Sequence, residues 1–163
     1  MRGAVCGIAL LAITSFAMAQ TPSLSGSWHC DKPSETHAIA VPGEPHHQFI
    51  VEQGQCASTE GNQVAGETLK TDVVTNVVEV TRGFLQNRGY GVVTSDSGDK
   101  LFVRTEERAH VVAGKPQDIR GRWRTAGGTG KLKGVRMRGT YTVTLNPDGS
   151  ADVKVVSTQP PQK

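Results

Sequence analysis

Apolar and polar residues alternate with a period of two along most of the chain from Ser25 onward, and no sustained helical stripe interrupts them. This period is typical of a strand with one buried and one solvated face. Glycine, proline and short polar residues separate the alternating segments, as expected of turns. The pattern predicts eight or nine strands, and a further segment, 64–70, carries it weakly. The segments with strand character are 25–30, 36–41, 48–53, 72–82, 84–94, 100–112, 119–126, 139–145 and 150–157.

In the C-terminal segments, apolar residues and arginines occupy opposite faces of the predicted strands. A slip of one residue in register would bury several arginines at a large desolvation cost, so the register is strongly specified. The predicted inner face includes Leu101, Val103, Trp123, Met137, Tyr141, Val143 and Leu145. The predicted outer, basic face includes Arg104, Arg108, Arg120, Arg122, Arg124, Arg136 and Arg138.

A sheet of eight strands without helices has two unpaired edges unless it closes on itself. Short turns between consecutive strands favour closure in simple up-and-down order. We therefore predict an all-β fold, a single antiparallel up-and-down barrel of eight or nine strands.

The first residues have the features of a secretory leader. Arg2 precedes an apolar run from Ala4 to Phe16, and small residues end at Ala19. This pattern predicts a signal peptide, 1–19, cleaved after Ala19, and a periplasmic or secreted product. The apolar run is too short to cross a bilayer, so no membrane span is expected. The remainder predicts one barrel domain, 20–157, and a disordered tail, 158–163, rich in proline and glutamine.

Two cysteines, Cys30 and Cys56, remain after the leader, and export would place them in an oxidising compartment. A disulfide is the favoured interpretation. The alternative is a metal site, because four histidines lie in the same part of the chain, but their spacing matches no zinc template. We expect neither a metal nor a cofactor. The histidines are His29, His37, His46 and His47.

The net charge of +3 conceals an uneven distribution. Residues 20–99 contain four Lys or Arg against ten Asp or Glu, a balance of −6, and residues 100–163 contain thirteen against five, a balance of +8. The asymmetry can mark a surface for an acidic partner. The favoured alternative is that the two halves neutralise each other as solvated, paired charges.

The glycine-rich segment 127–134 does not fit a nucleotide-binding loop. A Walker loop would require a glycine at the position of Thr125 and a Ser or Thr at the position of Leu132, and no helix pattern follows. The favoured interpretation is a loop that packs closely across the mouth of the barrel.

The run W-x-x-x-G-G-T-G-K-L-K-G from Trp123, continued by Gly139-Thr140-Tyr141, resembles the signature of the allene oxide cyclase-like barrels. This calycin-type group includes the plant dirigent proteins. Together with Gly98–Arg104, the run is also similar to small exported bacterial proteins of unknown function. The resemblance implies an eight-stranded barrel whose interior, in the plant members, holds a hydrophobic ligand and directs a cyclisation or a coupling.

Three functions follow as hypotheses. The first is a barrel that binds a small apolar or amphipathic ligand, with Trp123, Met137, Tyr141 and Glu79 as candidate lining residues. The second is a cyclase or isomerase, which requires an ionisable group inside an apolar cavity; Glu79 and His110 are the candidates, although the segment 72–82 alternates too poorly to orient Glu79.

The third hypothesis is an envelope interaction protein that presents the basic face to an acidic partner. Nucleic acid is not an expected partner, because the arginines lack the interleaved aromatic residues that stack bases. The chain has no G-x-S-x-G elbow, and the oligomeric state is not readable from the sequence.

Overall fold

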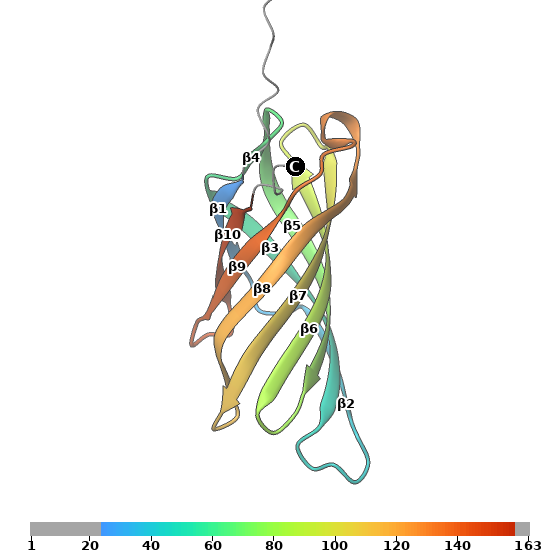
Figure 1. Cartoon of the computed structure of the whole chain (residues 1–163), viewed down its shortest axis with the longest axis vertical. Coiled ribbons are helices and arrows are strands. Elements are labelled where there is room, and N and C mark those ends of the chain that lie inside the picture. Colours follow the sequence, from blue (N-terminus) through green and yellow to red (C-terminus); the bar gives the residue numbers. More distant parts are fainter. Residues whose placement is uncertain (1–23, 159–163) are drawn as a thin grey trace, which may run out of the picture.

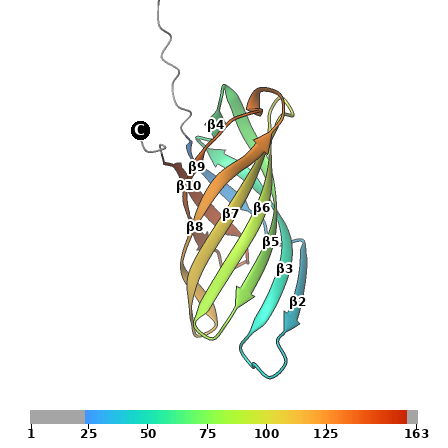
Figure 2. The same ribbon diagram turned by 45° about the vertical axis from the view of Figure 1, so that its right-hand side comes forward.

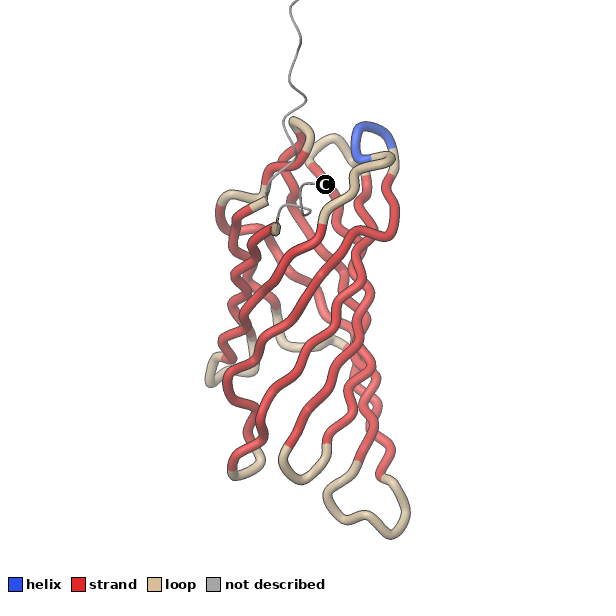
Figure 3. The backbone as a smooth tube through the Cα atoms, viewed as in Figure 1, coloured by secondary structure: helices blue, strands red, loops and turns tan. Residues whose placement is uncertain are grey.

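The structure, a computed structural model, describes residues 24–158. The predicted leader, 1–19, and all but the first residue of the predicted tail, 158–163, lie outside the described residues. Nearly all regular structure in the described chain is strand, with one short helical turn, η1, at one end (Figure 3). The elements are β1 (Ser25–Cys30), β2 (Glu35–Ala40), β3 (Gln48–Glu60), β4 (Gln63–Val64), β5 (Glu67–Val80), β6 (Phe84–Ser95), β7 (Lys100–Val112), β8 (Lys115–Gly128), η1 (Gly130–Leu132), β9 (Arg138–Leu145) and β10 (Ala151–Ser157).

Eight of these strands close into a barrel (Figure 1). The order around the wall is β1-β10-β9-β8-β7-β6-β5-β3, and β3 returns to β1. Every neighbouring pair is antiparallel. The predicted all-β antiparallel barrel is therefore confirmed, with β2 and β4 as two extra short strands.

The strand β2 has a partner on one side only. The first half of β3 pairs with β2, from Gln48 to Gln53, and the second half pairs with β1, from Cys56 to Glu60. Along the edge of β3, β1 and β2 therefore act as one strand interrupted by residues 31–34. The β2–β3 hairpin extends beyond the rest of the wall at the end opposite η1 (Figures 1 and 2).

Some strands are longer than the alternation predicted. β3 continues through Gly54 to Glu60, because Gly54 lies on the inner face and pairs with Val74 instead of turning the chain. The predicted segments 64–70 and 72–82 are largely one strand, β5, with a bulge between Leu69 and Thr71. A bulge inserts one residue and shifts the inward parity, so the alternation in this strand is broken.

The glycine-rich segment closes one end of the barrel, as expected. Leu132, in η1, has no exposed surface and packs in the cluster that includes Leu69 and Leu101. Lys131 Nζ lies 2.6 Å from Glu67 Oε1, and the backbone N–H of Lys131 donates to Asp99 Oδ2 at 2.8 Å. These contacts fix the loop over the η1 end, where the core is most tightly sealed.

The disulfide predicted for Cys30 and Cys56 is confirmed; the two residues are cross-strand partners in β1 and β3. Replacing both with alanine should lower the free energy of unfolding by about 3 kcal/mol, because the bond closes a segment of 26 residues in the unfolded chain. Denaturant unfolding of the variant and of the oxidised wild type measures the difference. A loss below about 1 kcal/mol would contradict this role.

Candidate ligand cavity

The barrel encloses a cavity of about 420 Å³. This volume is within the usual range for small-molecule sites. Most of its surface is apolar, and every strand of the barrel wall contributes to it. The apolar lining includes Leu24, Trp28, Ile50, Leu69, Val74, Val78, Leu85, Val93, Leu101, Val103, Ile119, Trp123, Val143, Leu145, Val153 and Val155.

A group of hydrogen-bonding side chains interrupts this apolar lining. We call it the polar belt, and it consists of Glu52, Asn76, Asn87, Thr105, Glu107 and Tyr141. These residues occupy two adjacent cross-strand rows of the inner face. One row contains Glu52, Asn76, Gly89 and Thr105, and the other contains Asn87, Glu107, Gly121 and Tyr141.

Two glycines leave room for the belt. A Cβ atom added at Gly89 would collide with the side-chain oxygens of Thr105 and Asn76, and one added at Gly121 would collide with the ring of Tyr141. Both glycines face inward on strands β6 and β8. The belt side chains therefore lie across positions that only glycine can occupy without displacing them.

The carboxyl group of Glu107 is held in the belt by neutral donors. Burial raises the pKa of Glu107, and hydrogen bonds from Tyr141 and from the Asn87 amide partly oppose that rise. The nearby Glu52 carboxylate raises the pKa further. Glu52 itself accepts a hydrogen bond from Asn76 Nδ2 at 3.2 Å. Burial and Glu107 together raise the pKa of Tyr141, so its hydroxyl remains protonated.

A second interior carboxyl group, Asp72, lies nearer the η1 end. It precedes Asn76 by four residues on β5, which corresponds to about 13 Å along the strand. Burial raises the pKa of Asp72 to about 7, although a backbone hydrogen bond from Val92 favours the carboxylate. Its Oδ1 atom is buried and has no hydrogen-bond partner.

Of the four predicted lining residues, two line the cavity and two lie elsewhere. Trp123 and Tyr141 line the cavity. Met137 is buried in the core cluster but is not among the lining residues. Glu79 lies on the outer face, where it contacts His47 Nε2 at 2.9 Å. After the bulge in β5, even-numbered residues such as Val78 face the cavity, and Glu79 consequently points outward.

The other acid–base candidate, His110, is also exposed, and its ring lies 5.0 Å from that of Phe84. None of the four carboxyl groups that line the cavity, those of Asp31, Glu52, Asp72 and Glu107, belongs to a predicted site residue. Glu107 has the same parity as Leu101 and Val103, so the alternation in β7 contains the signal that could have identified it. Asp72 offered no such signal, because the bulge precedes it.

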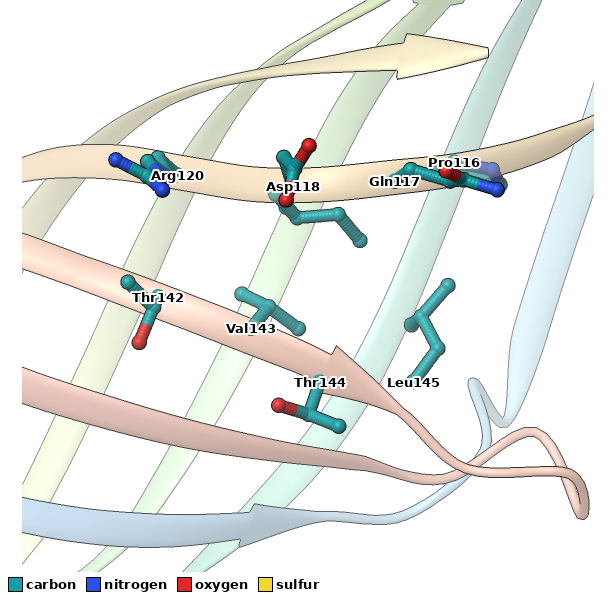
Figure 4. Close-up of a pocket in the computed structure, with 9 residues that line it drawn as sticks. Pro116, Gln117, Asp118, Arg120, Thr142, Val143, Thr144 and Leu145 are labelled. Atoms are coloured by element: carbon teal, nitrogen blue, oxygen red, sulfur yellow. The ribbon is translucent and has the colours of Figure 1, made fainter. Parts of the chain in front are cut away.

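A cleft between β8 and β9 leads toward the cavity. The two strands pair only from Arg120 to Arg124 on β8, so the start of β8 diverges from β9. Residues 116–120 and 142–145 lie on either side of the resulting cleft, which has a volume of about 410 Å³ (Figure 4). The cleft and the cavity have four lining residues in common, so the cleft offers a side entrance. These are Pro116, Ile119, Val143 and Leu145.

The predicted basic face is exposed, and its arginines are neighbours. Arg104 pairs with Arg124 across β7 and β8, and Arg124 pairs with Arg138 across β8 and β9. Like charges directly opposite one another destabilise a sheet. The Arg104 guanidinium lies 4.9 Å from the ring centre of Tyr90. Within residues 24–158, none of the arginines of this face forms an ion pair, and Arg108, Arg122 and Arg136 are also exposed.

The fold and the cavity define a closed eight-stranded antiparallel barrel with an enclosed interior, an architecture compatible with the calycin-type barrels. Comparisons of the chain with family models, curated proteins and solved structures found no match. Over the described part of the chain, no helix is long and apolar enough to span a bilayer. The same residues hold no cluster of three or more His, Cys, Asp or Glu side chains that could coordinate a metal ion.

Replacing Asp72 with asparagine should stabilise the protein at pH 8 and have little effect near pH 4. Because the pKa of Asp72 is higher in the folded state than in the unfolded chain, the wild type loses stability as the pH rises from about 4 to about 7. The difference above pH 7 should be between about 1 and about 4 kcal/mol. Denaturant unfolding at several pH values measures it.

The matched control is Glu79→Gln, which removes the same charge from the outer face of the same strand. This variant should not reproduce the stabilisation at pH 8. Equal pH profiles for Asp72→Asn and the wild type would show that Asp72 is in contact with water.

Proposed function

We propose that the barrel binds a small amphipathic molecule in its interior. The observation that supports this proposal is the combination of an enclosed, mainly apolar cavity with the polar belt in its wall. Apolar walls favour the transfer of an apolar body from water, and a few buried hydrogen-bonding groups orient it. One buried belt atom, Asn87 Oδ1, has no hydrogen-bond partner, and because burying such an atom is costly, this favours a ligand that supplies a donor.

The two ends of the barrel differ in a way that suits ligand entry. The η1 end is sealed, because the four largest fully buried side chains, Val64, Leu69, Leu101 and Leu132, lie there. At the opposite end, large apolar residues at the strand ends remain exposed. We therefore expect entry from that end or through the cleft between β8 and β9. The exposed residues are Phe84, Val112 and Leu145.

The same proposal includes membership of the allene oxide cyclase-like barrels and export from the cytoplasm. The closed barrel and the role of the glycine-rich loop support the family assignment, and the disulfide is compatible with an oxidising compartment. The acid–base requirement of a cyclase or isomerase, an ionisable group inside an apolar cavity, has candidates in Asp72 and Glu107. Binding of a ligand is the step that either activity would share.

Filling the cavity should weaken the binding of a neutral apolar probe. Val74 lines the cavity, whereas Val73, the preceding residue of β5, is 40% exposed on the outer face. We expect Val74→Trp to reduce the binding of Nile red by at least about 10-fold and Val73→Trp to leave it unchanged. Fluorescence titration measures both.

Val74→Leu, a smaller change, should give an intermediate loss if the larger variant folds poorly, and thermal melts of all variants check folding. Absence of Nile red binding to the wild type, or equal losses in Val73→Trp and Val74→Trp, would contradict an interior site.

A second candidate function, binding to an anionic polymer or an acidic protein surface, is favoured by the row formed by Arg104, Arg124 and Arg138. The row carries like charges on directly opposed residues without ion-pair partners among the described residues, an arrangement that an anionic partner would relieve. The exposed ring of Tyr90 extends the row onto β6.

Replacing these three arginines with serine should weaken binding to heparin at low salt by at least about 10-fold, because each arginine contacts the polyanion through its charge. The control removes three exposed lysines outside the row, Lys32, Lys70 and Lys154, so the net charge changes equally. Affinity chromatography in a salt gradient compares the variants. Equal losses in both would indicate an effect of net charge alone.

A further inference from the structure

The charged side chains that line the cavity are all acidic. Four carboxylic acids line it, the interior residues Glu52, Asp72 and Glu107 and the exposed residue Asp31, and the lining contains no lysine, arginine or histidine. Within residues 24–158, the ion pairs involve other carboxyl groups, namely those of Glu44, Glu67, Glu79 and Asp152. The interior acids therefore have no cationic partner from the described chain.

The belt also contains an acceptor that lacks a donor. Asn87 is 6% exposed, lines the cavity, and its Oδ1 atom has no hydrogen-bond partner. Its amide N–H group is directed to the Glu107 carboxylate, which can only accept while it is ionised. The oxygen of Asn87 is consequently the atom left for a ligand. A complementary ligand group must donate hydrogen bonds to this oxygen.

A second feature restricts the ligand further. The polar belt is bordered on the η1 side by Val103 and Trp123 and on the other side by Ile50, Val78 and Ile119. A bare inorganic cation would neutralise the acids but would leave this apolar surface in contact with water. A cation that carries an apolar body satisfies both the acids and the walls.

We propose that the ligand is an amphipathic organic cation, an amine whose ammonium group lies at the polar belt beside Glu107 and Glu52 and donates a hydrogen bond to Asn87. This inference rests on the proposed interior binding and specifies its ligand class. An ammonium group has three donors and no acceptor, which suits a site composed of two carboxylates and an amide oxygen. The apolar body then extends along the valine, leucine and isoleucine lining.

The test uses three probes of equal chain length at pH 8: 1-octylamine, 1-octanol and octanoate. Each displaces Nile red from the full barrel, and the displacement constants are compared. We expect 1-octylamine to bind at least about 10-fold more tightly than 1-octanol, and octanoate to bind most weakly, because the interior carboxylates repel it.

Variants of two adjacent residues on β7 locate the ammonium group. Glu107→Gln should bring the affinity for 1-octylamine to within about 3-fold of the affinity that the same variant has for 1-octanol. Glu106→Gln, which removes the same charge from the outer face, should change neither affinity. Glu52→Gln provides a second inner variant if Glu107→Gln unfolds at a lower temperature.

The possible results separate this inference from the proposed function. Equal affinities for 1-octylamine and 1-octanol, or the tightest binding for octanoate, would overturn the cationic ligand but leave interior binding intact. An amine preference that persists in both Glu107→Gln and Glu52→Gln would overturn the placement at the belt. If neither Nile red nor any of the three probes binds, the proposed function fails as well.

Discussion

Closure of the sheet is the constraint on which the other features of this barrel depend. Because each wall strand has neighbours on both sides, each of its side chains must face either the interior or the outside. Charge follows this division. Arg104, Arg124 and Arg138 face outward, whereas Glu52, Asp72 and Glu107 face the cavity. The acidic half of the sequence therefore does not simply neutralise the basic half on the surface, since part of its charge is enclosed.

Enclosure gives the interior carboxyl groups their chemical character. A carboxylate in contact with water has a low pKa, but burial in an apolar wall favours the protonated form, as for Asp72 and Glu107. Glycines at positions 89 and 121 provide the space in which the belt side chains lie. The sealed η1 end limits access to one end and one side, so the same groups can select a ligand. Stability, the proposed ligand choice and the proposed acid–base chemistry thus involve the same few residues.

Much of the fold could be predicted from the sequence, and the reasons are local. The period-two alternation in 84–94 and 100–112 and the arginine parity identified the strands and their outer face, because a slip in register would bury charge. The disulfide was predicted from two cysteines that the expected export would place in an oxidising compartment. The site was predicted less well. The bulge near Leu69 reverses the parity of β5, so it places Asp72 inside and Glu79 outside, and no residue in that segment indicates the bulge. Glu107 has the inner parity of its strand, but a glutamate that lies between Glu106 and Arg108 in the sequence is normally assigned to the surface.

Closure of the barrel encloses Asp72 and Glu107 among apolar side chains. Carboxyl ¹³C NMR of the native protein, titrated from pH 3 to pH 9, tests it most directly, because each carboxyl group reports its own protonation. We predict that Asp72 titrates near pH 7 and that Glu107 titrates above the range of the exposed glutamates. Titration of both groups near pH 4, together with the exposed carboxylates, would contradict an enclosed acidic interior.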